Sequence, residues 1–157
     1  MTTGGQRPPA RWIDLRRFTP ARVALGRAGN GLPTSAHLDF QAAHAAARDA
    51  VHTPLDVAAL VADLDAACLP NIAVHSEAPD RRTYLLRPDL GRRPRDLAAI
   101  RRLPGAMLFV VCDGLSATAV QRHAVTVLRH VIPRLPGVVA PVFVAEQGRV
   151  ALGDAIG

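Results

Sequence analysis

The chain has 157 residues, of which 49% are hydrophobic and only 4% aromatic, so it can bury one aliphatic core of ordinary domain size. All nineteen basic residues are arginine, and the formal net charge of +6 favours anionic partners. The apolar runs at 106–112 and 138–145 are too short to cross a bilayer. The two cysteines, Cys68 and Cys112, lie far apart in the sequence, which argues against a zinc site or a disulfide framework and indicates a reducing cytoplasm.

The first 70 residues are predicted to be mostly helical. Residues 1–12 are rich in glycine and proline and are expected to form a disordered tail without a secretory signal. In the segment 13–70, the pair Thr19-Pro20 has the pattern of an N-cap followed by a proline at the first helical position. A helix is predicted over about 35–51, and Thr53-Pro54 is expected to cap a second helix.

Residues 71–157 have the pattern of a parallel sheet. Strands are predicted at 71–76, 107–111 and 138–145, and a helix from Ser116 to Ile132. Irregular chain is expected over 80–95 and a short helix over 96–103. The two later strands are continuous apolar runs, which is typical of parallel strands covered on both faces. Together with the helix between them, they predict a right-handed β-α-β crossover. The predicted class is therefore α/β: a helical N-terminal segment plus an incomplete Rossmann-like, mostly parallel sheet whose last strand is an unpaired edge.

The ends of the two later strands form the main candidate site. Asp113–Ser116 follows one strand and Gly148–Val150 follows the next, so both are expected at the same edge of the sheet, where open α/β sheets bind their ligands. A carboxylate, a flexible glycine and the free N–H groups of a helix start would meet there, a combination that favours anions or amides. The structural alternative is that Ser116 only caps the helix and Gly114 only turns the chain.

Other motifs favour structural roles. The pairs His37/His44 and His123/His130 are each seven residues apart, about 10.5 Å of helical rise, which is too far for one metal ion. Neither cysteine lies near a general base in the sequence. The glycines of Gly26–Gly31 do not have dinucleotide-loop spacing, and the segment is expected to be a turn. No catalytic residue and no metal site is therefore predicted.

Arginines gather in one region of the chain. This region could contact nucleic acid, but a single aromatic, Tyr84, lies among the arginines, and Asp80, Asp89 and Asp96 interrupt the charge. A solvated face or a protein–protein contact is the preferred interpretation. The arginines concerned are Arg81, Arg82, Arg87, Arg92, Arg93, Arg95, Arg101 and Arg102.

Four blocks of sequence carry a resemblance to a known family. They are Phe143–Val150 followed by Gly153–Gly157, Leu15–Arg22 running to Gly26–Gly29, Leu85–Arg93, and Asp113–Ser116. In this order and over most of 15–157, the sequence resembles the light (small) chain of ethanolamine ammonia-lyase. The match corresponds to the N-terminal and central portion of that chain, truncated at its C-terminus.

The resemblance implies a function. The family's enzyme converts ethanolamine to acetaldehyde and ammonia with adenosylcobalamin, which lies between the light chain and a heavy chain that carries the catalytic side chains. The residue that matches Val150 lines the cobalamin, and the other light-chain contacts, a Glu and a Cys, lie beyond position 157. Residues 71–157 would thus be part of a cobalamin-binding portion, in a carbon–nitrogen lyase subunit that is inactive alone.

The resemblance also implies the partners and the location. It predicts a hetero-oligomer with the heavy chain, without nucleic acid or membrane, in the cytoplasm or in a bacterial microcompartment within it. Two alternatives from other classes stay open: an arginine-rich nucleic-acid-binding protein and a stand-alone nucleotide-binding α/β domain.

Overall fold

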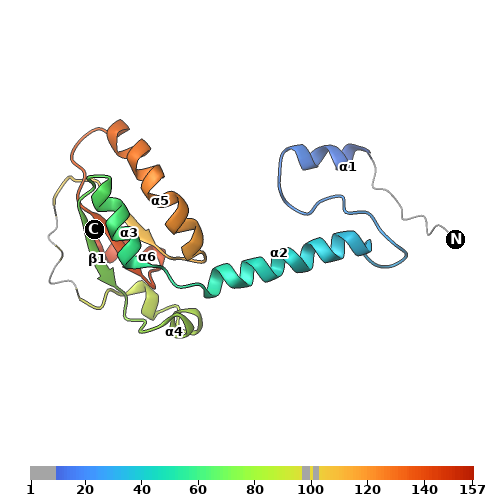
Figure 1. The fold of residues 1–157 in the computed structure, drawn as a ribbon, viewed down its shortest axis with the longest axis horizontal. Helices are drawn as coiled ribbons and strands as arrows, with labels where there is room; N and C mark the ends of the chain where they lie inside the picture. Colours follow the sequence, from blue (N-terminus) through green and yellow to red (C-terminus); the bar gives the residue numbers. More distant parts are fainter. Residues whose placement is uncertain (1–9, 97–99, 101–102) are drawn as a thin grey trace. The chain divides into compact units, whose positions relative to one another are not determined.

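The computed structural model describes residues 10–96, 100 and 103–157, and the chain divides into two compact units, Met1–Arg48 and Asp49–Gly157 (Figure 1). Residues 1–9 of the tail predicted over 1–12, and most of the helix predicted over 96–103, lie outside the described residues, whereas residues 10–12 form the start of a short helix. In the described part, no helix is both long enough and apolar enough to cross a membrane.

The first unit is helical but has no buried core in its described part. It contains α1 (Ala10–Asp14), the 3-10 turn η1 (Leu15–Arg17) and most of α2 (Thr34–His52), which confirms the helix predicted over about 35–51. None of its described residues is buried. Most of its larger apolar side chains are exposed, namely Trp12, Ile13, Leu15, Phe18, Leu32, Leu38 and Phe40.

The prediction of a helix that starts at Thr19-Pro20 is wrong. The Thr19 hydroxyl accepts a hydrogen bond from the Ala21 N–H at 3.1 Å, which makes a local turn and no helix cap. The backbone then takes positive φ values at Ala24 and Gly26, which a right-handed helix excludes. The Arg16 guanidinium donates to the carbonyl oxygens of Val23 and Ala24 and holds this irregular segment in place.

The second unit contains a three-stranded parallel sheet. The strands are β1 (Asn71–His75), β2 (Val110–Cys112) and β3 (Val142–Glu146), in the order β1-β3-β2. This confirms the α/β class and its parallel sheet. The prediction that the last strand is an unpaired edge of the sheet is wrong. β3 is the central strand, because it pairs with β1 on one side and β2 on the other. Upstream of β2 and β3, the predicted strands make only an isolated bridge from Met107 to Val139, so both are shorter than predicted.

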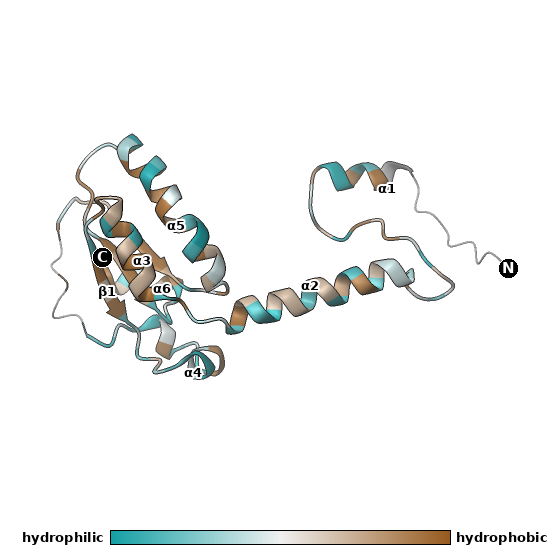
Figure 2. Cartoon of the chain, in the orientation of Figure 1, coloured by the Kyte–Doolittle hydropathy of each residue, from teal (hydrophilic) through white to brown (hydrophobic). Residues whose placement is uncertain are grey.

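Alternate residues of β3 pack into two different layers. Val142 and Val144 face a core formed with α3 (Val57–Ala66) and α5 (Ala117–Val131). Phe143 and Ala145 face a second core with Leu152 and Ile156 of α6 (Val150–Ile156). The hydrophobic strands accordingly lie between helices in Figures 1 and 2. Coverage of both faces explains the unbroken apolar character of this strand in the sequence.

The helix caps follow short polar side chains. The Ser116 side chain accepts from the Ala119 N–H at 3.2 Å at the start of α5, as predicted. The cap of α3 is Asp56, which accepts from the Ala59 N–H at 2.9 Å, so the predicted cap at Thr53-Pro54 is wrong by three residues. The region 80–95, predicted to be irregular, contains the helix α4 (Arg81–Leu86) capped by Asp80, and the 3-10 turn η2 (Leu90–Arg92).

Candidate functional site

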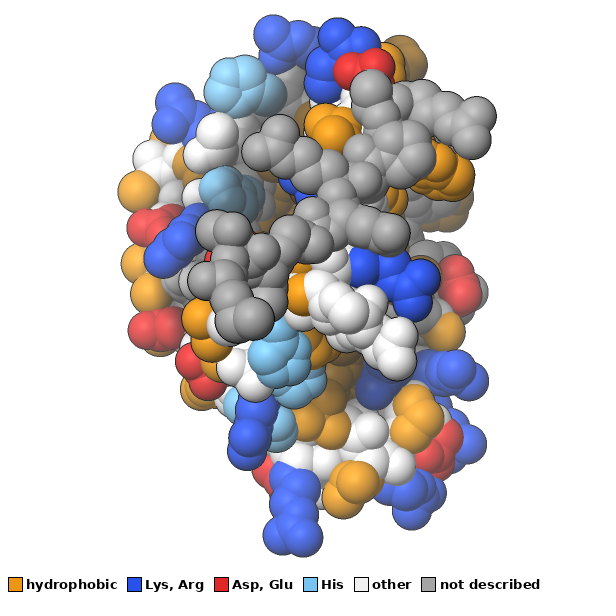
Figure 3. Space-filling view, turned by 90° about the vertical axis from the view of Figure 1, so that its right-hand side faces the viewer, with side chains coloured by type: hydrophobic (Ala, Val, Ile, Leu, Met, Phe, Trp, Pro, Cys, Tyr) orange, Lys and Arg blue, Asp and Glu red, His pale blue; other side chains and the backbone are white. Residues whose placement is uncertain are grey.

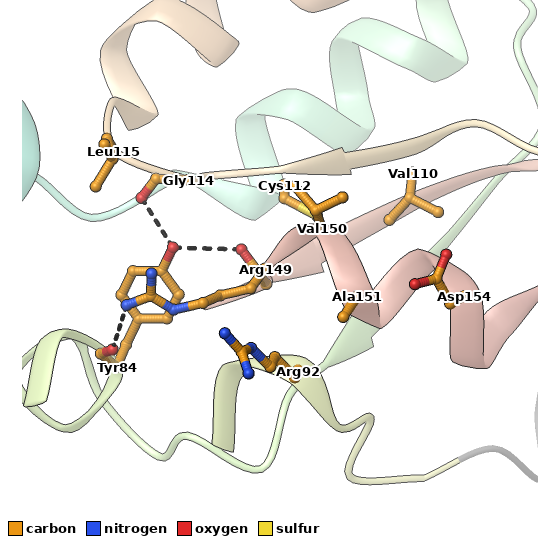
Figure 4. A pocket seen from close by; sticks show the side chains of 11 residues that line it. Tyr84, Arg92, Val110, Cys112, Gly114, Leu115, Arg149, Val150, Ala151 and Asp154 are labelled. Atoms are coloured by element: carbon orange, nitrogen blue, oxygen red, sulfur yellow. Dashed lines mark hydrogen bonds between the residues drawn. The ribbon is translucent and has the colours of Figure 1, made fainter. Parts of the chain in front are cut away.

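A hollow of about 810 Å³ lies at the carboxyl ends of β2 and β3 (Figure 4). Its wall includes Gly114 and Leu115 after β2, and Gly148, Arg149 and Val150 after β3. The two strand ends predicted to share one edge of the sheet therefore do so. Tyr84 of α4 and Arg92 of η2 close another side of the hollow, which the sequence had not indicated.

The buried side chain of Asp113 links the two strand ends. Its Oδ2 accepts from the Gln147 N–H at 3.1 Å and from the Arg81 guanidinium at 3.1 Å. Burial raises the pKa of Asp113, while the Gln147 N–H and the Arg81 charge oppose that rise. The carboxylate predicted to face a ligand instead points into the protein, where it links the turn after β2 to the turn after β3.

Tyr84 is held between two arginines. The Arg81 and Arg149 guanidinium carbons lie 4.7 and 4.3 Å from the centre of its ring, within the range of cation–π contact. Its buried hydroxyl lies 3.2 Å from the Gly114 carbonyl oxygen and 3.4 Å from that of Gly148, so it can donate to either strand end. Tyr84 thus fixes the spacing of the two segments that wall the hollow, as Figure 4 shows.

The turn after β3 depends on close packing at glycine. A Cβ on Gly148 would lie 2.8 Å from the Cys112 Sγ and 3.1 Å from both the Ala145 Cβ and the Leu152 Cδ2. The preceding residue, Gln147, has a φ of 56° and bends the chain sharply at the end of the strand. Only glycine lets the chain cross this closely over β2 before α6 begins.

The rim of the hollow is apolar and exposed. Val150, the first residue of α6, is 93% exposed, and Leu115 is 65% exposed. Val150 therefore does not pack inside the protein. An exposed apolar rim around a concave site is the pattern of a surface that a ligand or partner covers.

Most of the other candidate residues have structural roles. Ser116 caps α5 and is not part of the wall of the hollow. Gly26–Gly31 is a turn, closed by hydrogen bonds between Ala28 and Gly31 at 3.0 and 3.1 Å. In the described part of the chain, no group of three or more His, Cys, Asp or Glu side chains could hold a metal ion. His37 contacts Gln41 at 3.0 Å within its helix, and His75 of β1 lies 3.2 Å from the Glu146 carboxylate of β3.

The arginine-rich region is not a uniform solvated face. Arg81 is largely buried and pairs with Asp113, whereas Arg87 pairs with Asp89 and Arg93 with Glu77. Arg101 and Arg102 lie outside the described residues. On the face of the molecule drawn in Figure 3, arginine side chains lie among hydrophobic and histidine side chains.

Comparisons with known proteins agree on one family. The family model "Ethanolamine ammonia-lyase light chain (EutC)" matches residues 9–157. The chain is 50% identical to the ethanolamine ammonia-lyase small subunit of Pseudomonas fluorescens (strain Pf0-1), over 96% of this chain and 59% of that protein. It is 52% identical to the small subunit of Azotobacter vinelandii, over 93% of this chain and 58% of that protein. For Xanthomonas campestris pv. campestris (strain B100), the identity is 48% over the whole chain and 62% of that protein.

The chain thus spans about three fifths of the length of the curated relatives it matches. The match includes both strand ends, Tyr84 and Arg92, so the whole wall of the hollow lies within the matched range.

Proposed function

The chain belongs to the light-chain family of ethanolamine ammonia-lyases, and we propose that it acts as the light chain of an adenosylcobalamin-dependent enzyme of this kind. In this proposal it assembles with a heavy chain in the cytoplasm, with or without a microcompartment. The heavy chain carries the residues that act on ethanolamine, and the hollow at the end of the sheet receives part of the cobalamin.

The residues of the hollow fit a corrin ring. Corrin has a broad apolar surface edged with amide side chains, and the hollow offers the exposed Val150 and Leu115 side chains on its rim. The Gly114 carbonyl oxygen accepts from the Arg81 guanidinium at 2.8 Å, and the Tyr84 hydroxyl lies within donating distance of both this oxygen and that of Gly148, so the polar groups of the strand ends are held in place beside the apolar rim. Cobalamin is larger than 810 Å³ of hollow can enclose, which agrees with a cofactor covered from its other side by a second chain.

The chain's own contribution is binding and exclusion of water. Adenosylcobalamin supplies, when bound, the radical that abstracts hydrogen from the substrate. Val150 and Leu115 would cover the corrin surface, and the Tyr84 and Asp113 contacts would hold the two strand ends at a fixed spacing. A rigid site of this kind loses less entropy on binding than a mobile one. The single observation that carries the proposal is the 93% exposure of Val150 at the rim of the hollow.

The first prediction concerns Val150→Asp in a complex of this chain with an ethanolamine ammonia-lyase heavy chain. A carboxylate placed against an apolar corrin surface costs about 2 kcal/mol or more, which is about a thirtyfold loss of cobalamin affinity. The fold should be unchanged because the side chain is exposed. Cobalamin titration measures the affinity, and circular dichroism checks the fold.

Val127→Asp is the matched control, because Val127 is 54% exposed on α5 and lies outside the hollow. It should bind cobalamin as the unmodified chain does. Equal affinity in the Val150→Asp and unmodified complexes, with both folded, would refute the site. Deamination of ethanolamine by this chain alone, with cobalamin supplied, would refute the assignment as a subunit without catalytic residues.

A further inference from the structure

Two guanidinium groups face the same hollow from different elements. Arg92 comes from η2, and Arg149 lies at the end of the turn after β3, directly before α6. In Figure 4 the Arg92 guanidinium lies between that of Arg149 and the side chain of Ala151. Segments separated by more than fifty residues thus bring two cations to one wall of the site.

Neither cation has a carboxylate partner in the part of the chain that the structure describes. This contrasts with nearby Arg81, Arg87 and Arg93, each of which lies within 4.0 Å of a carboxylate. Arg149 is nevertheless held firmly, because it stacks on Tyr84 and its Nη2 donates to the Tyr84 carbonyl oxygen at 2.9 Å. Its Nε is buried and has no hydrogen-bond acceptor among the described residues.

The wall of the hollow carries one excess positive charge. Its ionised side chains are Arg92, Arg149 and Asp154, so one carboxylate opposes two guanidinium groups. The other titratable groups of the wall are neutral at pH 7, since burial raises the pKa of the Cys112 thiol to about 11 and also raises the pKa of Tyr84. The site therefore complements a ligand with one negative charge.

We infer that Arg92 and Arg149 bind the phosphodiester group in the nucleotide tail of cobalamin. The amide side chains of cobalamin are uncharged, and the phosphodiester is its one ionised side group. A guanidinium group presents paired N–H donors at the spacing of two phosphate oxygens, so two arginines can hold this group in a fixed orientation. The inference rests on the proposed function and adds that the hollow receives the tail side of the cofactor.

The test compares two ligands in the complex with the heavy chain. Adenosylcobalamin contains the phosphodiester, whereas adenosylcobinamide has the same corrin and no nucleotide tail. Arg92→Gln removes the charge and the fork of donors, and it breaks no ion pair among the described residues. Its affinity for adenosylcobalamin should fall about tenfold, and its affinity for adenosylcobinamide should be unchanged.

Arg82→Gln is the matched control, because Arg82 is an exposed arginine of α4 that lies outside the hollow. It should bind both ligands as the unmodified complex does. Raising the concentration of inorganic phosphate should weaken binding of adenosylcobalamin and leave adenosylcobinamide unaffected, since a free anion competes only for the phosphate subsite.

An equal loss for both ligands in Arg92→Gln would overturn the inference and would place Arg92 against the corrin amides. Unchanged affinity for both would overturn it as well. Binding of neither ligand by the unmodified complex would overturn the proposed function and this inference with it. The ratio between the two ligands therefore tests the phosphate contact, and the binding of the unmodified complex tests the site.

Discussion

The turn after β3 makes a sharp prediction about Gly148→Ala. A methyl group at this position would meet the Cys112 Sγ at 2.8 Å, the Ala145 Cβ at 3.1 Å and the Leu152 Cδ2 at 3.1 Å. Non-bonded carbon atoms prefer a separation of about 3.5–4.0 Å, so all three neighbours must move. The Ala145 methyl cannot move without β3, because its Cβ is fixed to the backbone of the central strand.

Overpacking of this kind typically costs about 1–3 kcal/mol. For a unit of about a hundred residues, each kcal/mol corresponds to roughly 4 °C or more in the unfolding midpoint. We therefore expect Gly148→Ala to lower the midpoint of thermal unfolding by about 4–12 °C. The same change made in a Cys112→Ala background should cost less, because the nearest of the three contacts is removed.

Gly153→Ala is the matched control. Its added Cβ would find only the Val110 Cγ2, at 3.8 Å, and the residue lies within α6. Replacing a helical glycine by alanine should stabilise the protein by about 0.5–1 kcal/mol. Thermal and urea unfolding of all five proteins, with Cys112→Ala as the reference for the double variant, provide the measurement. If Gly148→Ala unfolds with the midpoint of the unmodified chain, the turn does not need glycine and the packing argument is wrong.

Two further predictions concern stability. Ser116→Ala removes the acceptor for the Ala119 N–H and should cost about 1 kcal/mol in urea unfolding; a Ser116→Asp variant that fails to retain that stability would contradict the cap. Burial raises the pKa of Cys112 from 9.0 to about 11, so the folded state holds the thiol proton more tightly than the unfolded state, and the associated stability is complete below pH 9 and lost as the pH rises towards 11. The free energy of unfolding in urea should therefore be lower at pH 10.5 than at pH 8, and Cys112→Ala should reduce this difference. An equal difference in both proteins would show that the thiol is not responsible.

The features that were predicted correctly from the sequence are those that a local pattern of residues determines. The helix of α5, its cap at Ser116 and the parallel strands followed from apolar periodicity and a single polar residue. The common edge of Asp113 and Gly148 followed from the rule that parallel strands end on the same side. The orientation of Asp113 did not follow, because whether a carboxylate faces a ligand or a buried arginine depends on a segment some thirty residues away.

The missed part of the site comes from α4 and η2. Proline and glycine residues around Leu85–Gly91 indicated irregular chain, but the Asp80 side chain accepts from the Thr83 N–H at 2.7 Å and starts a short helix. A signal was present in Asp80 itself, because aspartate is one of the residues preferred at a helix N-cap. The hydrogen bond from the Arg149 N–H to the Gly91 carbonyl oxygen, at 2.8 Å, is a tertiary contact, and local sequence does not encode it.

The central position of β3 has a consequence for the order in which the sheet can form. β1 and β2 are not neighbours, since each pairs with β3, from Asn71 opposite Val142 and from Val110 opposite Phe143. During synthesis, neither early strand therefore has the partner that the described sheet gives it until β3 has left the ribosome. Until then, the edges of β1 and β2 lack this pairing, and unpaired strand edges are prone to aggregate.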